Sequence, residues 1–128
     1  MINKVILVGR LGADPEIRST QSGKAVAVLS LATNERWKGE DGEVKEFTQW
    51  HRVVLWNGLA EIAEKYLSKG RLIAIEGSIR YREYEKDGSK QRVTEIVARD
   101  MKMLDRGKQK EEPAETGEAP EEEEDIPF

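Results

Sequence analysis

The chain has no cysteine and a single histidine, His51, among its 128 residues. The absence of cysteine excludes a disulfide framework and a cysteine-based zinc site. One histidine leaves a catalytic triad or a metal site with little besides carboxylates to use. The stretch from Gly9 to Gly12 lacks the Gly-Lys-Ser/Thr ending and the following helix of a phosphate loop. We therefore expect no enzymatic activity, no cofactor and no bound metal.

Long apolar runs are also missing. The run from Val5 to Val8, close to the first residue, is too short for a signal peptide or a membrane span. We expect a soluble, cytoplasmic protein with no membrane partner. Glutamate and lysine are abundant while asparagine, glutamine and methionine are sparse, which hints at a thermophilic source.

Basic residues are absent from the last part of the chain. Residues 1–110 hold 21 Lys+Arg and 16 Asp+Glu, a formal charge of +5, whereas residues 111–128 hold nine acidic residues, a formal charge of −9, and the two sum to −4. Acidic charge of this density repels itself and stays extended. We predict a folded, mildly basic domain over residues 1–105, which suits a polyanion, and a disordered acidic tail over residues 106–128.

The acidic tail ends on apolar side chains. Its last four residues are Asp125, Ile126, Pro127 and Phe128. Acidic tails often serve only solubility, but solubility needs no terminal phenylalanine. Phe128 and Ile126 would enter an apolar pocket of another protein, and the carboxylates would meet its basic rim. We predict that these four residues dock a partner protein.

The pattern of apolar residues predicts five strands and one helix. The strands are expected at 3–11, 25–35, 47–56, 72–84 and 91–104, with a polar loop over 38–46 and an Asp-Gly hairpin turn within 85–90. Helical spacing predicts a helix over 59–67, with Asn57 as its N-cap and Gly70 as its stop signal. This order is typical of the OB-fold, an all-β, five-stranded Greek-key barrel with one helix between the third and fourth strands. An open α+β sheet is the alternative.

Aromatic and cationic side chains alternate on two of these strands. Because side chains alternate between faces, the third strand groups on one face Thr48, Trp50, Arg52, Val54 and Trp56. The fourth strand groups Arg80, Arg82 and Tyr84 opposite its core residues Ile73, Ile75, Ile79 and Tyr81. Flat rings stack on unpaired bases, and cations follow the phosphates. The candidate residues for binding single-stranded nucleic acid are Trp37, Trp50, Arg52, Trp56, Arg80, Arg82, Tyr84, Lys90 and Arg92.

Each of these residues also has a structural interpretation. A single tryptophan on a strand is more often core than a binding surface. Arg80 and Arg82 could belong to a solvated face, paired with Glu83 or Glu85. Tyr66 and Tyr81 are expected to be structural, and His51 to make a packing or interface contact.

Several motifs in order and spacing resemble the bacterial single-stranded DNA-binding protein family. They are Asn3 to Gly12 with Asp14-Pro15-Glu16, Leu31 to Asn34, Glu46 to Leu55 with Trp50-His51-Arg52, Tyr66-Leu67, Lys69-Gly70, Ile75 to Gly77 and Asp125 to Phe128. The resemblance covers nearly the whole chain. It implies an OB-fold homotetramer that wraps single-stranded DNA and serves replication, repair and recombination.

The resemblance also implies roles for particular residues. It gives base stacking to Trp37, Trp50 and Trp56, a subunit contact to His51, and partner docking to the last four residues. The chain departs from the family pattern at Tyr84, where some members have tryptophan, and at Trp56, where phenylalanine is common. The linker 106–120 lacks the Gly/Gln-rich stretch of many members. Two other functions stay open: an RNA-binding OB module, and an adaptor whose barrel binds no nucleic acid.

Overall fold

The chain folds into a closed β-barrel. The structure, a computed structural model, describes residues 1–105. Its elements are β1 (Val5–Leu11), β2 (Glu16–Ser19), β3 (Ala25–Lys38), β4 (Val44–Trp56), α1 (Gly58–Tyr66), β5 (Leu72–Lys86) and β6 (Ser89–Met103). The strand order is β1-β5-β6-β4-β3-β2, and an additional pairing of β1 with β3 closes the five longer strands into a barrel. This closure confirms the expected architecture and excludes the open sheet.

Two elements differ in detail from the sequence prediction. The segment Glu16–Ser19 is a separate strand, β2, and it pairs with β3 along its whole length. Asn57 does precede α1, but its side chain makes no capping hydrogen bond and its backbone has a φ of 56°. The backbone carbonyl of Asn57 instead accepts the N–H of Glu61 at 3.0 Å. The predicted side-chain cap is therefore wrong, although the position at which the helix begins is right.

The core lies inside the barrel and beneath α1. Alternate residues of the strands point inward, and the largest fully buried side chains are Leu29, Leu31, Leu55, Leu67, Ile73, Ile75 and Val53. The helix adds the small side chains Ala60 and Ala63, which are also buried. Small residues let α1 approach the strands closely, so that one short helix covers this part of the barrel.

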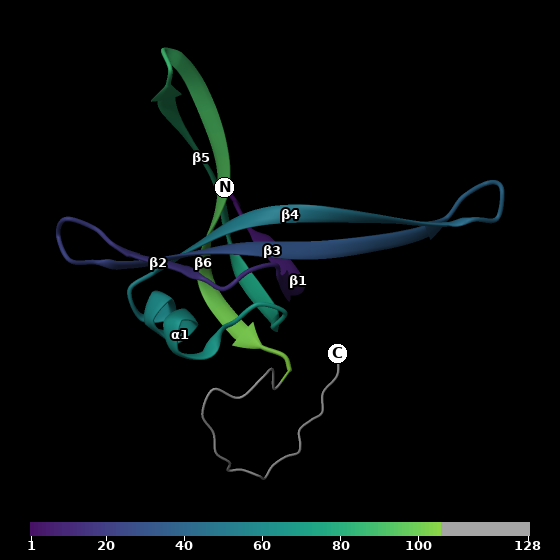
Figure 1. The fold of residues 1–128 in the computed structure, drawn as a ribbon, viewed down its shortest axis with the longest axis horizontal. Coiled ribbons are helices and arrows are strands. Elements are labelled where there is room, and N and C mark those ends of the chain that lie inside the picture. The colour runs from purple at the N-terminus through teal and green to yellow at the C-terminus, as the bar shows by residue number, and fades with distance from the viewer. Residues whose placement is uncertain (106–128) are drawn as a thin grey trace, which may run out of the picture.

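Two long hairpins leave the barrel in different directions, one made by β3 and β4 and the other by β5 and β6 (Figure 1). The first stays paired out to Lys38 and Val44, so the polar loop predicted over 38–46 is a turn of residues 39–43. The N–H of Gly39 closes that turn on the carbonyl of Glu43 at 2.8 Å. Beyond the barrel, inward-facing positions meet no core. Tyr81 is 57% exposed for this reason. Tyr66 on α1 is 44% exposed, so the structural role predicted for both rings is wrong.

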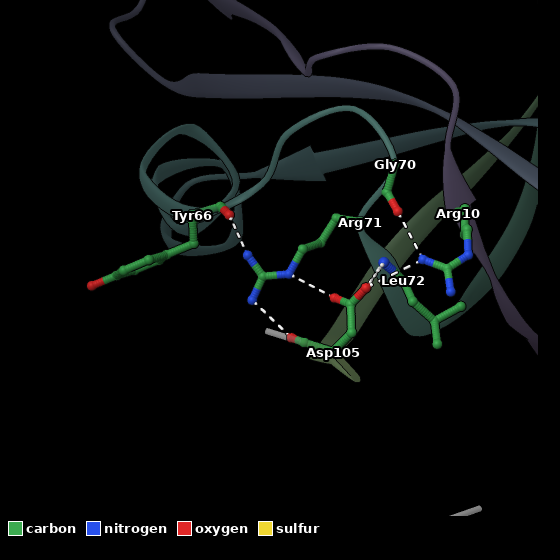
Figure 2. Close-up of polar contacts among 6 residues, drawn as sticks. All are labelled: Arg10, Tyr66, Gly70, Arg71, Leu72 and Asp105. Carbon is green, nitrogen blue, oxygen red and sulfur yellow. Dashed lines mark hydrogen bonds and ion pairs between the residues drawn. The ribbon is translucent and has the colours of Figure 1, made fainter. Parts of the chain in front are cut away.

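The end of β6 is tied to three other elements by Asp105 (Figure 2). Its Oδ1 accepts Nε of the nearly buried Arg71 at 2.9 Å, and its Oδ2 accepts the N–H of Leu72 and Nη1 of Arg10, each at 3.2 Å. Arg71 also donates to the backbone carbonyls of Asp105 and Tyr66, at 3.0 and 2.9 Å. Asp105 thus joins β1, the end of α1 and the start of β5 at the last described residue.

Replacing Arg71 with alanine is expected to destabilise the fold by about 1–3 kcal/mol, because Oδ1 of Asp105 and the backbone carbonyls of Tyr66 and Asp105 lose the donor that Arg71 provides. The matched control is Arg18→Ala. Arg18 pairs with Glu16 on an exposed strand, and such surface pairs contribute little. Urea unfolding of both variants measures the difference. Equal stabilities would contradict this role of Asp105.

Candidate nucleic-acid interface

The aromatic and cationic residues predicted on two strands share one face of the sheet. Cα partners in a ladder lie on the same face. Arg80 pairs with Glu95 across β5 and β6, and Val54 pairs with Val97 where β4 and β6 run parallel. Hence one continuous surface, here called the outer face, carries Trp50, Arg52 and Trp56 from β4, Arg80, Arg82 and Tyr84 from β5, and Glu95 from β6.

The tryptophans of the outer face are accessible to solvent. Trp50 is 62% exposed and Trp56 is 37% exposed, so neither belongs to the core. The ring of Trp50 lies against the backbone of Gly12. A β-carbon added at Gly12 would collide with Cζ3 of Trp50 and lie 2.7 Å from Cη2. The absence of a side chain at Gly12 thus lets the six-membered ring of the indole rest on the barrel while most of the residue stays exposed.

Three of the predicted binding residues lie on the other side of the hairpins. Trp37 lies within β3, beyond the predicted end of that strand at residue 35. It pairs with Lys45, on the same face of the hairpin as the inward-facing core residues. Trp37 is half exposed. Lys90 and Arg92 likewise alternate with the outer-face positions of β6. The guanidinium carbon of Arg92 lies 5.0 Å from the ring centroid of Tyr81, a cation–π arrangement on this inner side.

A buried carboxylate joins the outer-face arginines. Glu95 is 6% exposed, and its Oε2 accepts Nε of Arg52 at 3.0 Å and Nη2 of Arg82 at 2.9 Å. The partner of Arg82 is therefore Glu95 across the hairpin, not Glu83 or Glu85 on its own strand. Because Arg52 comes from β4 and Arg82 from β5, this contact fixes the two rows of the outer face relative to each other.

The environment of Glu95 changes its pKa. Burial raises the pKa of Glu95, but the hydrogen bonds and charges of Arg82 and Arg52 outweigh burial and hold it below the ordinary value of 4.5. The hydrogen bond and charge of Glu95 in turn raise the pKa of Arg82. A lowered folded-state pKa stabilises the fold above the ordinary pKa, and this contribution is lost as the pH falls through the folded-state pKa.

We therefore expect acid to remove the stabilisation that Glu95 provides. The difference in unfolding free energy between the parent and Glu95→Gln should be constant near neutral pH and should shrink below about pH 4.5. Urea unfolding between neutral and acidic pH measures it. Glu83→Gln, which removes one negative charge at an exposed position, controls for the general effect of charge. A difference that grows in acid would contradict this expectation.

Sequence reasoning missed Glu95 and the contact of Gly12 with Trp50. Glu95 had a signal, since it is a lone charge within the β-branched run Val93 to Val97, and such a charge needs a partner when buried. Gly12 had a weaker signal because a glycine at a strand end also fits a turn.

His51, the predicted subunit residue, is half-buried and pairs with Leu31 of β3, and its Nε2 lies 2.9 Å from Oγ1 of Thr33. Within residues 1–105, no group of three His, Asp or Glu side chains could hold a metal.

The closed barrel of five strands, with its helix between β4 and β5, defines a protein of the OB-fold class. The model of the single-strand binding protein family matches residues 2–104. The chain belongs to that family.

Relatives and solved structures agree with this assignment. The single-stranded DNA-binding protein of Neisseria meningitidis serogroup A is 49% identical over 104 residues, which are 80% of this chain and 60% of the relative. That of Xylella fastidiosa (strain Temecula1) is 53% identical over 104 residues, or 80% and 63%. This chain thus spans about three fifths of the length of these relatives.

Two solved structures share the fold. The Plasmodium falciparum SSB complex with ssDNA superposes with a TM-score of 0.76 at 36% identity, over 82% of this chain and 96% of that one. A deletion mutant of the single-stranded DNA binding protein from Thermus aquaticus gives 0.72 at 38% identity, over 81% and 51%.

Proposed function

We propose that this protein binds single-stranded DNA without sequence preference. The observation that carries the proposal is the outer face, where exposed indole rings and a guanidinium group alternate along β4 and share the surface with the guanidinium groups of β5, across β6. Rings stack on any unpaired base, and cations that neutralise phosphates release counterions. A reader of duplex DNA would instead present a helix or ribbon to the major groove. The family assignment and the solved complex of a relative with ssDNA support the same function.

Quenching of tryptophan fluorescence by oligo-dT tests the proposal. Stacking on Trp50 and Trp56 should quench the emission, and rising salt should reverse the effect. An RNA oligomer of equal sequence separates DNA binding from an RNA-binding module, and a duplex of the same length tests strand preference. Emission that oligo-dT leaves unchanged in dilute buffer would exclude stacking and favour the adaptor.

The proposal extends to the C-terminal residues, which lie outside the described residues. In cytoplasmic replication, repair and recombination, the barrel would protect single strands while Asp125, Ile126, Pro127 and Phe128 recruit enzymes. Their sequence supports this, because an apolar tip behind an acidic run suits an apolar pocket with a basic rim.

Deleting residues 121–128 should abolish partner docking and leave DNA binding equal or slightly stronger, because removed carboxylates no longer compete with DNA for the basic domain. Phe128→Ala in the full chain is the matched variant, since it keeps every carboxylate and removes the ring. Pull-down with a bacterial replication or repair enzyme measures docking. A truncated protein that still docks normally would exclude the tip.

We also propose a homotetramer with His51 at a subunit contact. The resemblance to the family supports this state. So does the half-buried position of His51, which lies on the core-facing side of β4 next to the buried Val53. Light scattering with and without oligo-dT measures the assembly, and a monomer under both conditions would exclude it.

A further inference from the structure

The buried carboxylate of Glu95 lies at the root of both hairpins. The parallel pairing of β4 with β6 begins beside it, at Val53 and Ile96, and the hairpins diverge from this region (Figure 1). Directly across the ladder from Glu95 is Arg80, a third cation of the outer face. Glu95 is the one buried charged residue among residues 1–105. Its burial is costly unless it is paired, so its two arginine partners account for its presence.

The same contact leaves much of each guanidinium free for another anion. Both hydrogen bonds end on Oε2, and each arginine uses one nitrogen, Nε of Arg52 and Nη2 of Arg82. The side chains of Arg52 and Arg82 are 39% and 48% exposed, whereas that of Glu95 is 7% exposed. A guanidinium has five N–H donors, so donors remain on the solvent side. A phosphate approaching the two arginines would meet the carboxylate behind them.

The net charge of the cluster formed by Arg52, Glu95 and Arg82 determines how strongly it attracts a phosphate of the DNA strand. Two guanidiniums and one carboxylate carry a net charge of +1. A carboxylate within several ångströms of a bound phosphate repels it, and the repulsion is strongest where water is displaced. The arginines that face the strand are therefore partly neutralised before any DNA arrives.

We propose that Glu95 is a built-in counter-ion of the DNA-binding surface, holding Arg52 and Arg82 in place while cancelling one unit of their positive charge toward the phosphates. This inference rests on the proposed function. The cluster releases fewer counterions than two free arginines would, so binding is less sensitive to salt and the strand is easier to release. Glu95 is a positioning residue, since the arginines lie between it and solvent.

The salt dependence of DNA binding by Glu95→Gln in the full chain tests the proposal. Glutamine keeps the shape and an acceptor oxygen but removes the charge. For single strands, log K falls with log salt by about 0.7 for each phosphate neutralised. The slope of the variant should therefore be steeper by about 0.7, and the ratio of its affinity to that of the parent should fall about sevenfold between about 20 and about 300 mM salt. Titrations of labelled oligo-dT, followed by anisotropy, give the line of log K against log salt for the variant and for the parent.

Controls separate this role from structure and from general charge. Glu83→Gln removes the same charge from the same hairpin, but Glu83 pairs with Arg92 on the inner side, so its line should follow the parent. Should Glu95→Gln not fold, the double variant E95Q/R82Q restores the net charge of the cluster. It should have the slope of the parent, whereas Arg82→Gln alone should be shallower by about 0.7.

Equal slopes of log K against log salt for Glu95→Gln and the parent would overturn the proposal. So would equal steepening in Glu83→Gln, or a double variant as shallow as Arg82→Gln. A parent that does not bind oligo-dT would instead refute the proposed function, so the two failures are distinguishable.

Discussion

Replacing Gly77 with alanine is expected to destabilise the barrel by about 3 kcal/mol or more, and to lower the melting temperature by more than about 10 °C. Gly77 lies in β5 beside the register shift of the β5–β6 ladder. A β-carbon there would collide with the carbonyl oxygen of Val97 and lie 2.8 Å from its carbonyl carbon and 2.9 Å from Cα of Ala98. All three atoms belong to the backbone, so no side-chain rotation relieves the overlap. The strands must separate or the hydrogen bonds must break.

Gly58→Ala is the matched control for this prediction. No atom lies within 4 Å of a β-carbon built at Gly58, which is the first residue of α1. Alanine lowers the entropy of the unfolded chain and favours helix, so stability should be unchanged or rise by up to about 1 kcal/mol. Thermal unfolding of the two variants gives the comparison. If Gly77→Ala melted with the parent, close approach of the backbones would not be the reason for glycine at this position.

The fold was predictable because the strand and helix patterns in the sequence match the elements of the barrel and their order. Alternation in β4 and β5, the helical spacing after Asn57 and the order of the strands and the helix all favour a small closed barrel, which the structure shows. The hairpin ends were not predictable in the same way. Lys38, Lys45 and Glu46 are polar and Val44 is exposed, so no buried apolar pattern marks these positions, and cross-strand pairing alone keeps them in the ladder.

The candidate site was predictable as a face but not as a network. Period-two alternation suffices to place Trp50 with Arg52 and Arg80 with Arg82, because it holds wherever a strand is regular. It does not tell which strands adjoin, so it missed the pairing of Arg52 and Arg82 with Glu95. It also treated Tyr81 as core because the sequence does not show where β5 leaves the barrel. Burial depends on the neighbouring strands, and these are set by the topology.

Replacing Trp50 with alanine is expected to weaken binding of single-stranded DNA by about 5- to 150-fold, which corresponds to the 1–3 kcal/mol of one stacked base. Most of the Trp50 surface is open to solvent, so its loss should affect folding little. Because the variant also removes a fluorophore, anisotropy of a labelled oligo-dT is the suitable measurement. Trp50→Phe keeps a ring in place and should recover part of the affinity. Tyr66→Ala removes an exposed ring from α1, away from the outer face, and should bind as the parent does.

The contact of Trp50 with Gly12 provides an independent test of the same stacking role. Gly12→Ala leaves every aromatic and charged group of the outer face in the chain, yet its β-carbon occupies the place where the indole rests. The ring must move, so single-strand affinity should fall toward that of Trp50→Ala, while the double variant should be no weaker than Trp50→Ala alone. Additive losses would show that Gly12 acts through another group. A Trp50→Ala protein that unfolds, or that binds oligo-dT like the parent, would show that this ring is not a stacking surface.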